Sequence, residues 1–209
     1  TQIKNKLKNY SIAGINAEIV DLKILFVELD STVYFNPSSI ASSVNLRSSI
    51  ISALQLYSKN VEINKFGGRF KYSKINQLID RVDNGITSNI TKVIIRRDLK
   101  ASLNQFAQYE LCFGNRFNIN PAGYNIKSTG FTVSGSDKIA YLTDVPNKDA
   151  AGNLDGSMKG TVSIVSKNNK NQQVVLVKGA GIVDYMKGEV ILNTVNFTST
   201  VAENNIVEV

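Results

Sequence analysis

The side chains that could do chemistry in this 209-residue chain are few and poorly placed for catalysis. The chain has no histidine, which removes Ser-His-Asp and Cys-His catalysis and the commonest zinc ligand. Its single cysteine, Cys112, cannot form an internal disulfide, and we expect it to be a small buried hydrophobic residue. The sequence therefore predicts no catalytic residue, no metal site and no cofactor site, and we expect a protein that is not an enzyme.

Two groups of acidic residues could be taken for a calcium site and for a pair of catalytic carboxylates. Asp144, Asp149 and Asp155 fall in a predicted polar loop, but their spacing does not match an EF-hand and the bidentate glutamate is missing. Asp184 and Glu189 flank a predicted turn, where charged residues are routine, although a glycosidase also uses two carboxylates. We interpret the first group as a solvated loop and the second as a hairpin end.

Aromatic and basic residues alternate after the first predicted helix. They form the best candidate for a surface on which nucleic-acid bases could stack. The alternative is that the aromatic rings close the end of a sheet while the basic groups stay in water. Gly67 and Gly68 lie in the same loop, FGGRF, and without a GxxxxGK[ST] motif we expect a turn and not a phosphate-binding loop. The run contains Lys65, Phe66, Arg69, Phe70, Lys71 and Tyr72.

The net charge of +7 is carried by one half of the chain. Residues 1–105 sum to +7, whereas residues 106–209 sum to zero. A basic half could bind nucleic acid or an acidic protein, although a solvated basic face is the more common explanation. No apolar run approaches 18 residues, so we expect no membrane-spanning segment.

The stretch from Val20 to Arg97 must position any site in the basic half. We expect a strand over Asp21–Phe35, bent or split near its middle, and a returning strand over Ser88–Arg97. Arg96 and Arg97 lie at the end of the second strand. They could make an electrostatic contact with a partner, but we favour the interpretation that their charges prevent another strand from pairing with this edge.

Two amphipathic helices are expected between these strands. Ser38 or Ser39 should cap the first helix and Ser73 the second. The apolar stripes of both helices should lie on the sheet. The first stripe holds Leu46, Ile50, Ala53 and Tyr57, widened by Ile40, Val44, Ile51 and Leu54, and the second holds Ile75, Leu78, Ile79 and Val82.

Helical periodicity fades after residue 109, where short strand-like runs and turns rich in Gly, Asn and Asp follow. The fold class we predict is α+β, a small strand-helix-helix-strand domain followed by an antiparallel β domain. We expect an N-terminal helix and connector over 1–18, an α+β docking domain over 19–105 and a β-rich domain over 106–209. Residues 98–109 should be a polar connector.

The order of these parts resembles a known family. A long alternating strand is followed by NPSS, the helix SVNLRSSIISALQLYSKN, the turn FGGRF, the helix YSKINQLIDRVDNGI and the strand SNITKVIIRR. With the later run VDYMKGEVILN (Val183 to Asn193), this order resembles the C-terminal part of baseplate wedge proteins of the gene-product-six type. That type belongs to T-even-like contractile-tailed bacteriophages, in the baseplate J-like family.

The resemblance implies a structural component of a phage tail baseplate wedge. Such a protein forms part of the inner ring around the hub, through self-association and contacts with other wedge proteins, and takes part in the rearrangement on tail contraction. Its expected location is the virion tail baseplate, after assembly in the host cytoplasm. No catalytic residue, small-molecule substrate or membrane contact is implied, and this chain would be a C-terminal part of a longer protein.

Two other functions stay open at this point. One is a nucleic-acid-binding module that uses the basic α+β domain, and the other is a carbohydrate-binding β domain with Tyr124 or Tyr185 as the stacking ring. We rank sugar binding lowest because the chain has no tryptophan. The candidate subunit contacts are Phe66, Arg69, Phe70, Arg96 and Arg97.

Overall fold

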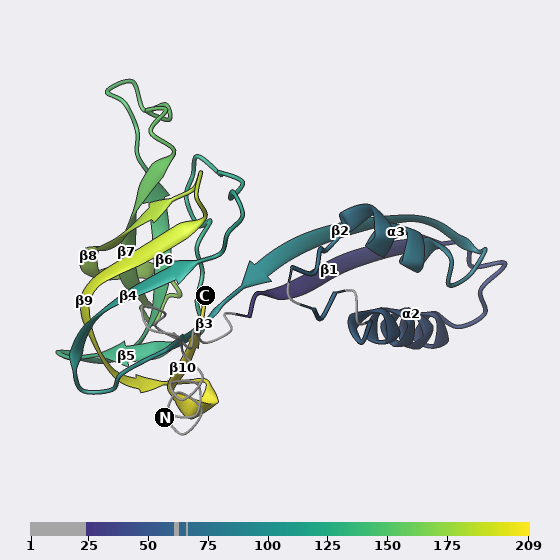
Figure 1. The fold of residues 1–209 in the computed structure, drawn as a ribbon, viewed down its shortest axis with the longest axis horizontal. Helices are drawn as coiled ribbons and strands as arrows, with labels where there is room; N and C mark the ends of the chain where they lie inside the picture. The colour runs from purple at the N-terminus through teal and green to yellow at the C-terminus, as the bar shows by residue number, and fades with distance from the viewer. Residues whose placement is uncertain (1–23, 61–62, 66) are drawn as a thin grey trace, which may run out of the picture.

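The computed structural model describes residues 24–60, 63–65 and 67–209, in which an elongated arm projects from a β domain (Figure 1). The predicted N-terminal helix over 1–18 lies outside the described residues. The arm contains strands β1 (Phe26–Phe35) and β2 (Ile86–Arg96) and helices α2 (Ser43–Ser58) and α3 (Tyr72–Asp80).

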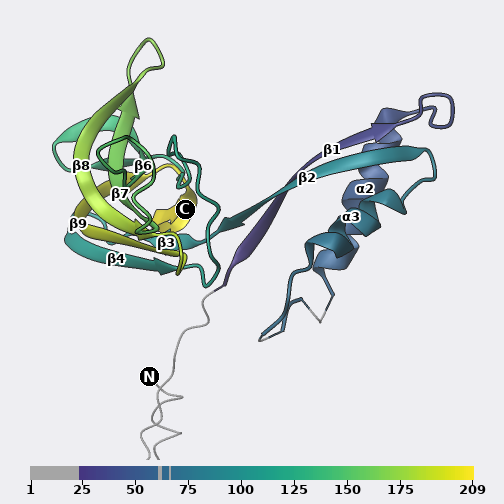
Figure 2. The same cartoon turned by 90° about the horizontal axis from the view of Figure 1, so that it is seen from above.

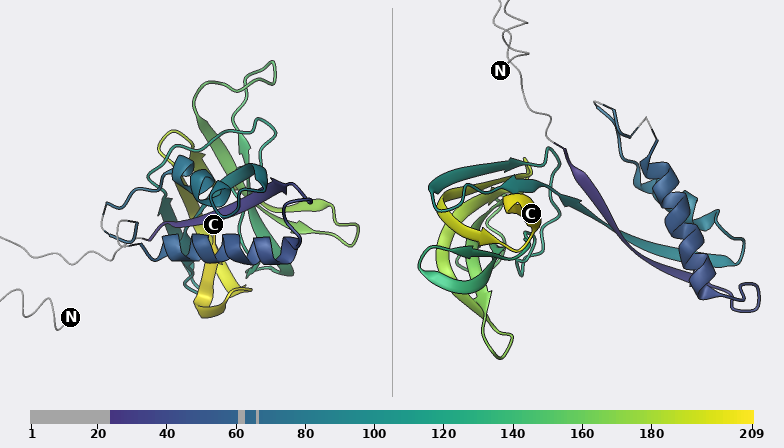
Figure 3. Two further views of the ribbon diagram at one scale, coloured as in Figure 1. Left: turned by 90° about the vertical axis from the view of Figure 1, so that its right-hand side faces the viewer. Right: turned by 90° about the horizontal axis from the view of Figure 1, so that it is seen from below.

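The two strands of the arm form an antiparallel ribbon that is twisted along its length (Figure 2). The register pairs Phe26 with Arg96 at the end near the β domain and Phe35 with Ile86 at the far end. One face of the ribbon packs Leu29, Val33 and Phe35 against both helices, because alternate residues of a strand point to the same side. The other face is left without a covering layer (Figure 3).

Both helices begin at different residues from those predicted. Ser42, not Ser38 or Ser39, caps α2, and its hydroxyl accepts a hydrogen bond from the Asn45 amide at 3.3 Å. Pro37 and Ser38 instead belong to a separate turn that precedes the helix. At α3 the N-cap is Lys71 and not Ser73, without a side-chain hydrogen bond.

The predicted apolar stripes are correct at their centres and too wide at their edges. Leu46 and Ile50 of α2 are buried, as are Ile75 and Ile79 of α3. Two members of the wider α2 stripe are instead exposed, Val44 at 71% and Ile51 at 43%. A two-stranded ribbon is too narrow to cover a broad helix face, which explains why these side chains stay in solvent.

The β domain is a closed sheet. Strands β5, β6, β7 and β8 follow one another as antiparallel neighbours, and β9 closes them into a barrel because it pairs with both β8 and β5. Strand β4 also pairs with β9. Its strands are β3 (Asp98–Lys100), β4 (Phe106–Cys112), β5 (Phe131–Val133), β6 (Ser136–Pro146), β7 (Lys159–Lys167), β8 (Gln173–Asp184), β9 (Glu189–Thr200) and β10 (Ile206–Glu208), with a short 3-10 helix over Glu203–Asn205.

The residues after the arm are more ordered than predicted. Residues 98–109 do not form a plain connector, because they contain β3, which pairs with β10, and the start of β4. Leu99 and Ala101 are buried in the core of the β domain. Residues 98–105 thus pack with the second unit, although the division into domains itself stays a prediction.

The core of the barrel is aromatic at its centre. Phe197 lies edge-to-face against Tyr109 and Phe131, with ring centroids 5.3 and 4.9 Å away. The described residues form an α+β protein with a mostly antiparallel sheet, which confirms the predicted fold class at that level. Within the described part of the chain, no helix is long and apolar enough to cross a membrane.

Candidate functional site

The junction between the arm and the β domain is built around Arg96. Its guanidinium group lies 4.5 Å from the ring centroid of Phe26 and ion-pairs with Glu28 at 3.2 Å and Asp98 at 3.7 Å. It also donates a hydrogen bond to the carboxylate of Glu208 at the C-terminal strand. A residue predicted as an edge guard or a subunit contact therefore holds two parts of its own chain together.

Arg97 joins the same junction through its backbone. Its amide donates to the Val209 carbonyl at 2.8 Å, and the Val209 amide donates back at 2.9 Å. Leu25 and Ile95 at the base of the ribbon pack against the core of the β domain. A role for Arg96 and Arg97 in contacts between subunits stays a prediction.

The loop predicted as FGGRF contributes less to an open surface than the sequence indicated. Phe66 lies outside the described residues, and Arg69 is exposed. Phe70 is half-buried and packs against the arm core, and the Tyr72 hydroxyl donates to the Thr91 carbonyl at 2.9 Å. Within the described residues, these aromatic contacts support the alternative in which the rings close the sheet, and nothing supports a stacking surface for nucleic acid.

The arm leaves apolar surface uncovered in two places. A groove of about 440 Å³ runs between β1 and α2, lined chiefly by Val33, Phe35, Leu46, Ile50 and Leu54. On the open face of the ribbon, the exposed fractions are 51% for Tyr34, 63% for Ile90 and 42% for Ile94. Each strand has one partner among the described residues, so the ribbon also has two free edges.

Asp144 is not in a loop, which corrects the interpretation of the first acidic group. It lies in β6, is 1% exposed, and accepts hydrogen bonds from the Ile126 amide at 2.7 Å, the Asn125 side chain at 2.8 Å and the Tyr185 hydroxyl. Burial, followed by this hydrogen bond and the carboxylate charge, raises the pKa of Tyr185 far above its usual range. Because Tyr185 is fully buried, it cannot be a stacking ring for sugars.

The remaining acidic residues make local contacts. Asp149 accepts from the amides of Ala151 and Asn153, both at 2.9 Å. The pKa of Asp155 is lowered by the hydroxyl and then the amide of Ser157. These contacts account for two carboxylates of the first group as caps of loop turns.

Asp184 and Glu189 face each other at the end of the β8–β9 hairpin. The Asp184 carboxylate accepts from the Lys187 amide at 3.0 Å, and Glu189 ion-pairs with Lys187 at 3.8 Å. Both carboxylates contact Lys187 in the turn, in agreement with their interpretation as a hairpin end.

One group of possible metal ligands comes together in the described part of the chain. Ligand atoms of Glu110, Cys112 and Glu189 all lie within 4.8 Å of one another. Cys112 is half-buried, not buried as predicted, and its sulfur is 3.3 Å from a Glu110 carboxylate oxygen. Glu189 also forms an ion pair with Lys187, so each of the three side chains has a partner within the chain.

The fold and these contacts define a class before any comparison. It is a helix-covered ribbon anchored on a β domain, with apolar surface that the described residues leave uncovered and that a partner protein could cover. Residues 23–98 match the family of the baseplate structural protein gp6, C-terminal domain III. The match spans the arm from three residues before β1 to the start of β3, which is just over a third of the chain. A comparison with curated protein sequences found no match.

The match supports a structural role in a phage baseplate, and with it a location in the virion tail. The matched residues coincide with the arm and with the stretch from Val20 to Arg97 in which the sequence predicts two strands and two helices. The sequence analysis missed the partners of Arg96. Glu208 lies 112 residues further along the chain, so no local pattern connects the two residues.

Proposed function

We propose that this chain is a component of a phage tail baseplate wedge that forms part of the inner ring around the hub. It does so through self-association and contacts with other wedge proteins, and it takes part in the baseplate rearrangement on tail contraction. The observation that carries the proposal is the match of residues 23–98 to a baseplate structural protein domain. The match coincides with one structural unit, the arm, whose apolar surface is uncovered.

The arm is the expected docking element. Its free ribbon edges and the exposed side chains of Tyr34, Ile90 and Ile94 offer the main-chain and apolar surface that a neighbouring subunit would cover. Exposed apolar side chains on one narrow face are costly to leave in water, and burial in a ring removes that cost.

Self-association is tested by size-exclusion chromatography with light scattering on the 209-residue chain. We expect a concentration-dependent mass above that of the monomer at high micromolar concentration. Tyr34→Glu together with Ile90→Glu should return the monomer mass, because charges are then placed in the buried interface. Leu56→Glu is the matched control, since Leu56 is 76% exposed on α2. A monomer at every concentration would contradict intrinsic self-association.

A further inference from the structure

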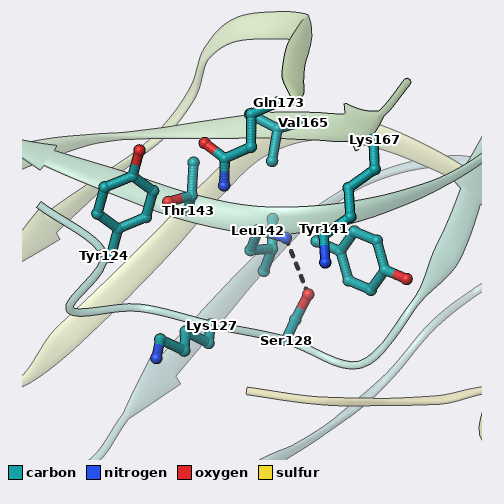
Figure 4. A pocket seen from close by; sticks show the side chains of 9 residues that line it. All are labelled: Tyr124, Lys127, Ser128, Tyr141, Leu142, Thr143, Val165, Lys167 and Gln173. Atoms are coloured by element: carbon teal, nitrogen blue, oxygen red, sulfur yellow. Dashed lines mark hydrogen bonds between the residues drawn. The ribbon is translucent and has the colours of Figure 1, made fainter. Parts of the chain in front are cut away.

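A second hollow lies on the outer wall of the barrel, away from the arm. It has a volume of about 240 Å³ and lies where the loop before β5 crosses β6 and β7. Figure 4 shows Tyr124 on one side and Lys167 beside Tyr141 on the other, with Leu142 and Thr143 between them. The Lys167 ammonium lies 5.9 Å from the ring centroid of Tyr141, which places its charge beside the hollow.

The hollow is lined by side chains that can donate hydrogen bonds to a ligand. The Ser128 hydroxyl oxygen accepts from the Leu142 amide at 2.9 Å, so its own proton is still available. Gln173 adds a side-chain amide group. The Thr143 hydroxyl oxygen has no hydrogen-bond partner among the described residues, but it is buried and does not face a ligand. The Ser128 and Gln173 donors suit a ligand that accepts hydrogen bonds.

The charge around the hollow favours an anion. Lys127 and Lys167 line it, and no acidic side chain does so among the described residues. A neighbouring hollow of about 460 Å³ shares Lys167 and adds Lys138 and Lys170. Two adjoining basic hollows fit a ligand that carries several negative charges along its length, and not a single small anion.

We propose that this basic groove, made by the two hollows around Lys167, binds an acidic segment of a neighbouring protein. A carboxylate of that segment accepts from the Ser128 hydroxyl while the Lys167 ammonium balances its charge. The apolar floor of Leu142 and Val165 suits the methylene groups of an aspartate or glutamate side chain. The choice of a protein partner rests on the proposed function, because a baseplate component is surrounded by other proteins.

The test uses the full 209-residue chain and a fluorescent ten-residue oligoglutamate peptide, read by anisotropy at about 0.05 M salt, where screening is weak. We expect saturable binding. Lys167→Met should weaken binding at least fivefold, and Ser128→Ala, which removes the hydroxyl donor, should weaken it about fivefold. Lys178→Met is the matched control and should stay within about twofold, because Lys178 is exposed on β8 outside both hollows.

Three results would overturn the proposal. They are no binding, binding that Lys167→Met and Lys178→Met weaken equally, and an oligoglutamine peptide that binds as well as oligoglutamate. A ten-residue oligothymidylate that binds more tightly than oligoglutamate, and depends on Lys167, would assign the groove to nucleic acid instead. Melting curves of each variant check the fold. Failure of peptide binding leaves the baseplate assignment standing, because the position of the chain in the particle tests that assignment separately.

Discussion

At the scale of single residues, the informative positions are two charged groups, the half-buried Arg96 and the buried Asp144, most of whose partners lie far along the chain. Arg96 forms ion pairs with Glu28, Asp98 and Glu208, which lie on three different strands. In the barrel wall, Asp144 accepts hydrogen bonds from Asn125, Ile126 and Tyr185. Their residue types are visible in the sequence, but their roles are not, because the partners are distant along the chain and only folding brings them together.

Replacing Arg96 should loosen the base of the arm. Arg96→Met keeps part of the packing stem but removes the ion pairs and the contact with the Phe26 ring. We expect the free energy of unfolding to fall by about 1–2 kcal/mol, a modest loss because Glu28 is half exposed. Urea unfolding followed by circular dichroism measures it. Arg116→Met, at an exposed loop residue, should cost nothing measurable, and an equal loss in both variants would refute the role of Arg96.

Removing the Tyr185 hydroxyl should expose a pH-dependent part of the stability. At pH 7 to 9, Tyr185→Phe should lower the free energy of unfolding by about 1–2 kcal/mol, because a hydrogen bond to a carboxylate is lost. The folded-state pKa of Tyr185 is raised, so its contribution is complete below about pH 10, the unfolded value, and is lost as pH rises further. The difference between wild type and variant should therefore shrink above about pH 10. Urea unfolding at a series of pH values measures it, and a constant difference would contradict this assignment.

At the scale of elements, hydrophobic periodicity located both helices and most strands, since the core faces of α2, α3 and the barrel strands repeat at regular spacings. Element boundaries were less predictable. Three serines precede α2 within five residues, and the turn that follows Pro37 decides which of them caps it. The short strand-like runs expected after residue 109 include one that is longer in the structure, β8, because barrel pairing carries this strand through Gly179 and Gly181.

The cap of α2 provides a prediction at this scale. Ser42→Ala should lower the free energy of unfolding by about 1 kcal/mol, because the Asn45 amide loses its acceptor. Thermal melting of the full chain compares this variant with Ser39→Ala, which removes one of the two hydroxyls that the sequence predicted as the cap. The Ser39 variant should be close to wild type. If Ser39→Ala proves the more destabilising change, the cap lies where the sequence placed it.

At the scale of the whole molecule, the protein combines a helix-covered arm with a β domain (Figure 1). Composition and charge argued against an enzyme, but they could not place the basic groove, because its residues come from two loops and three strands. Only Tyr124 of that groove stood out in the sequence, and then as a ring for sugars. The family match concerns the arm alone, so the role of the β domain depends on where the chain sits in the particle.

The most direct test of the central claim is a cryo-electron microscopy map of the tail of the phage that encodes this chain. The account predicts density for the arm and the barrel in the baseplate, with copies arranged as a ring around the hub and the open ribbon face covered by a neighbouring subunit. A baseplate map without this fold, or copies found only in the capsid or along the tail tube, would contradict it.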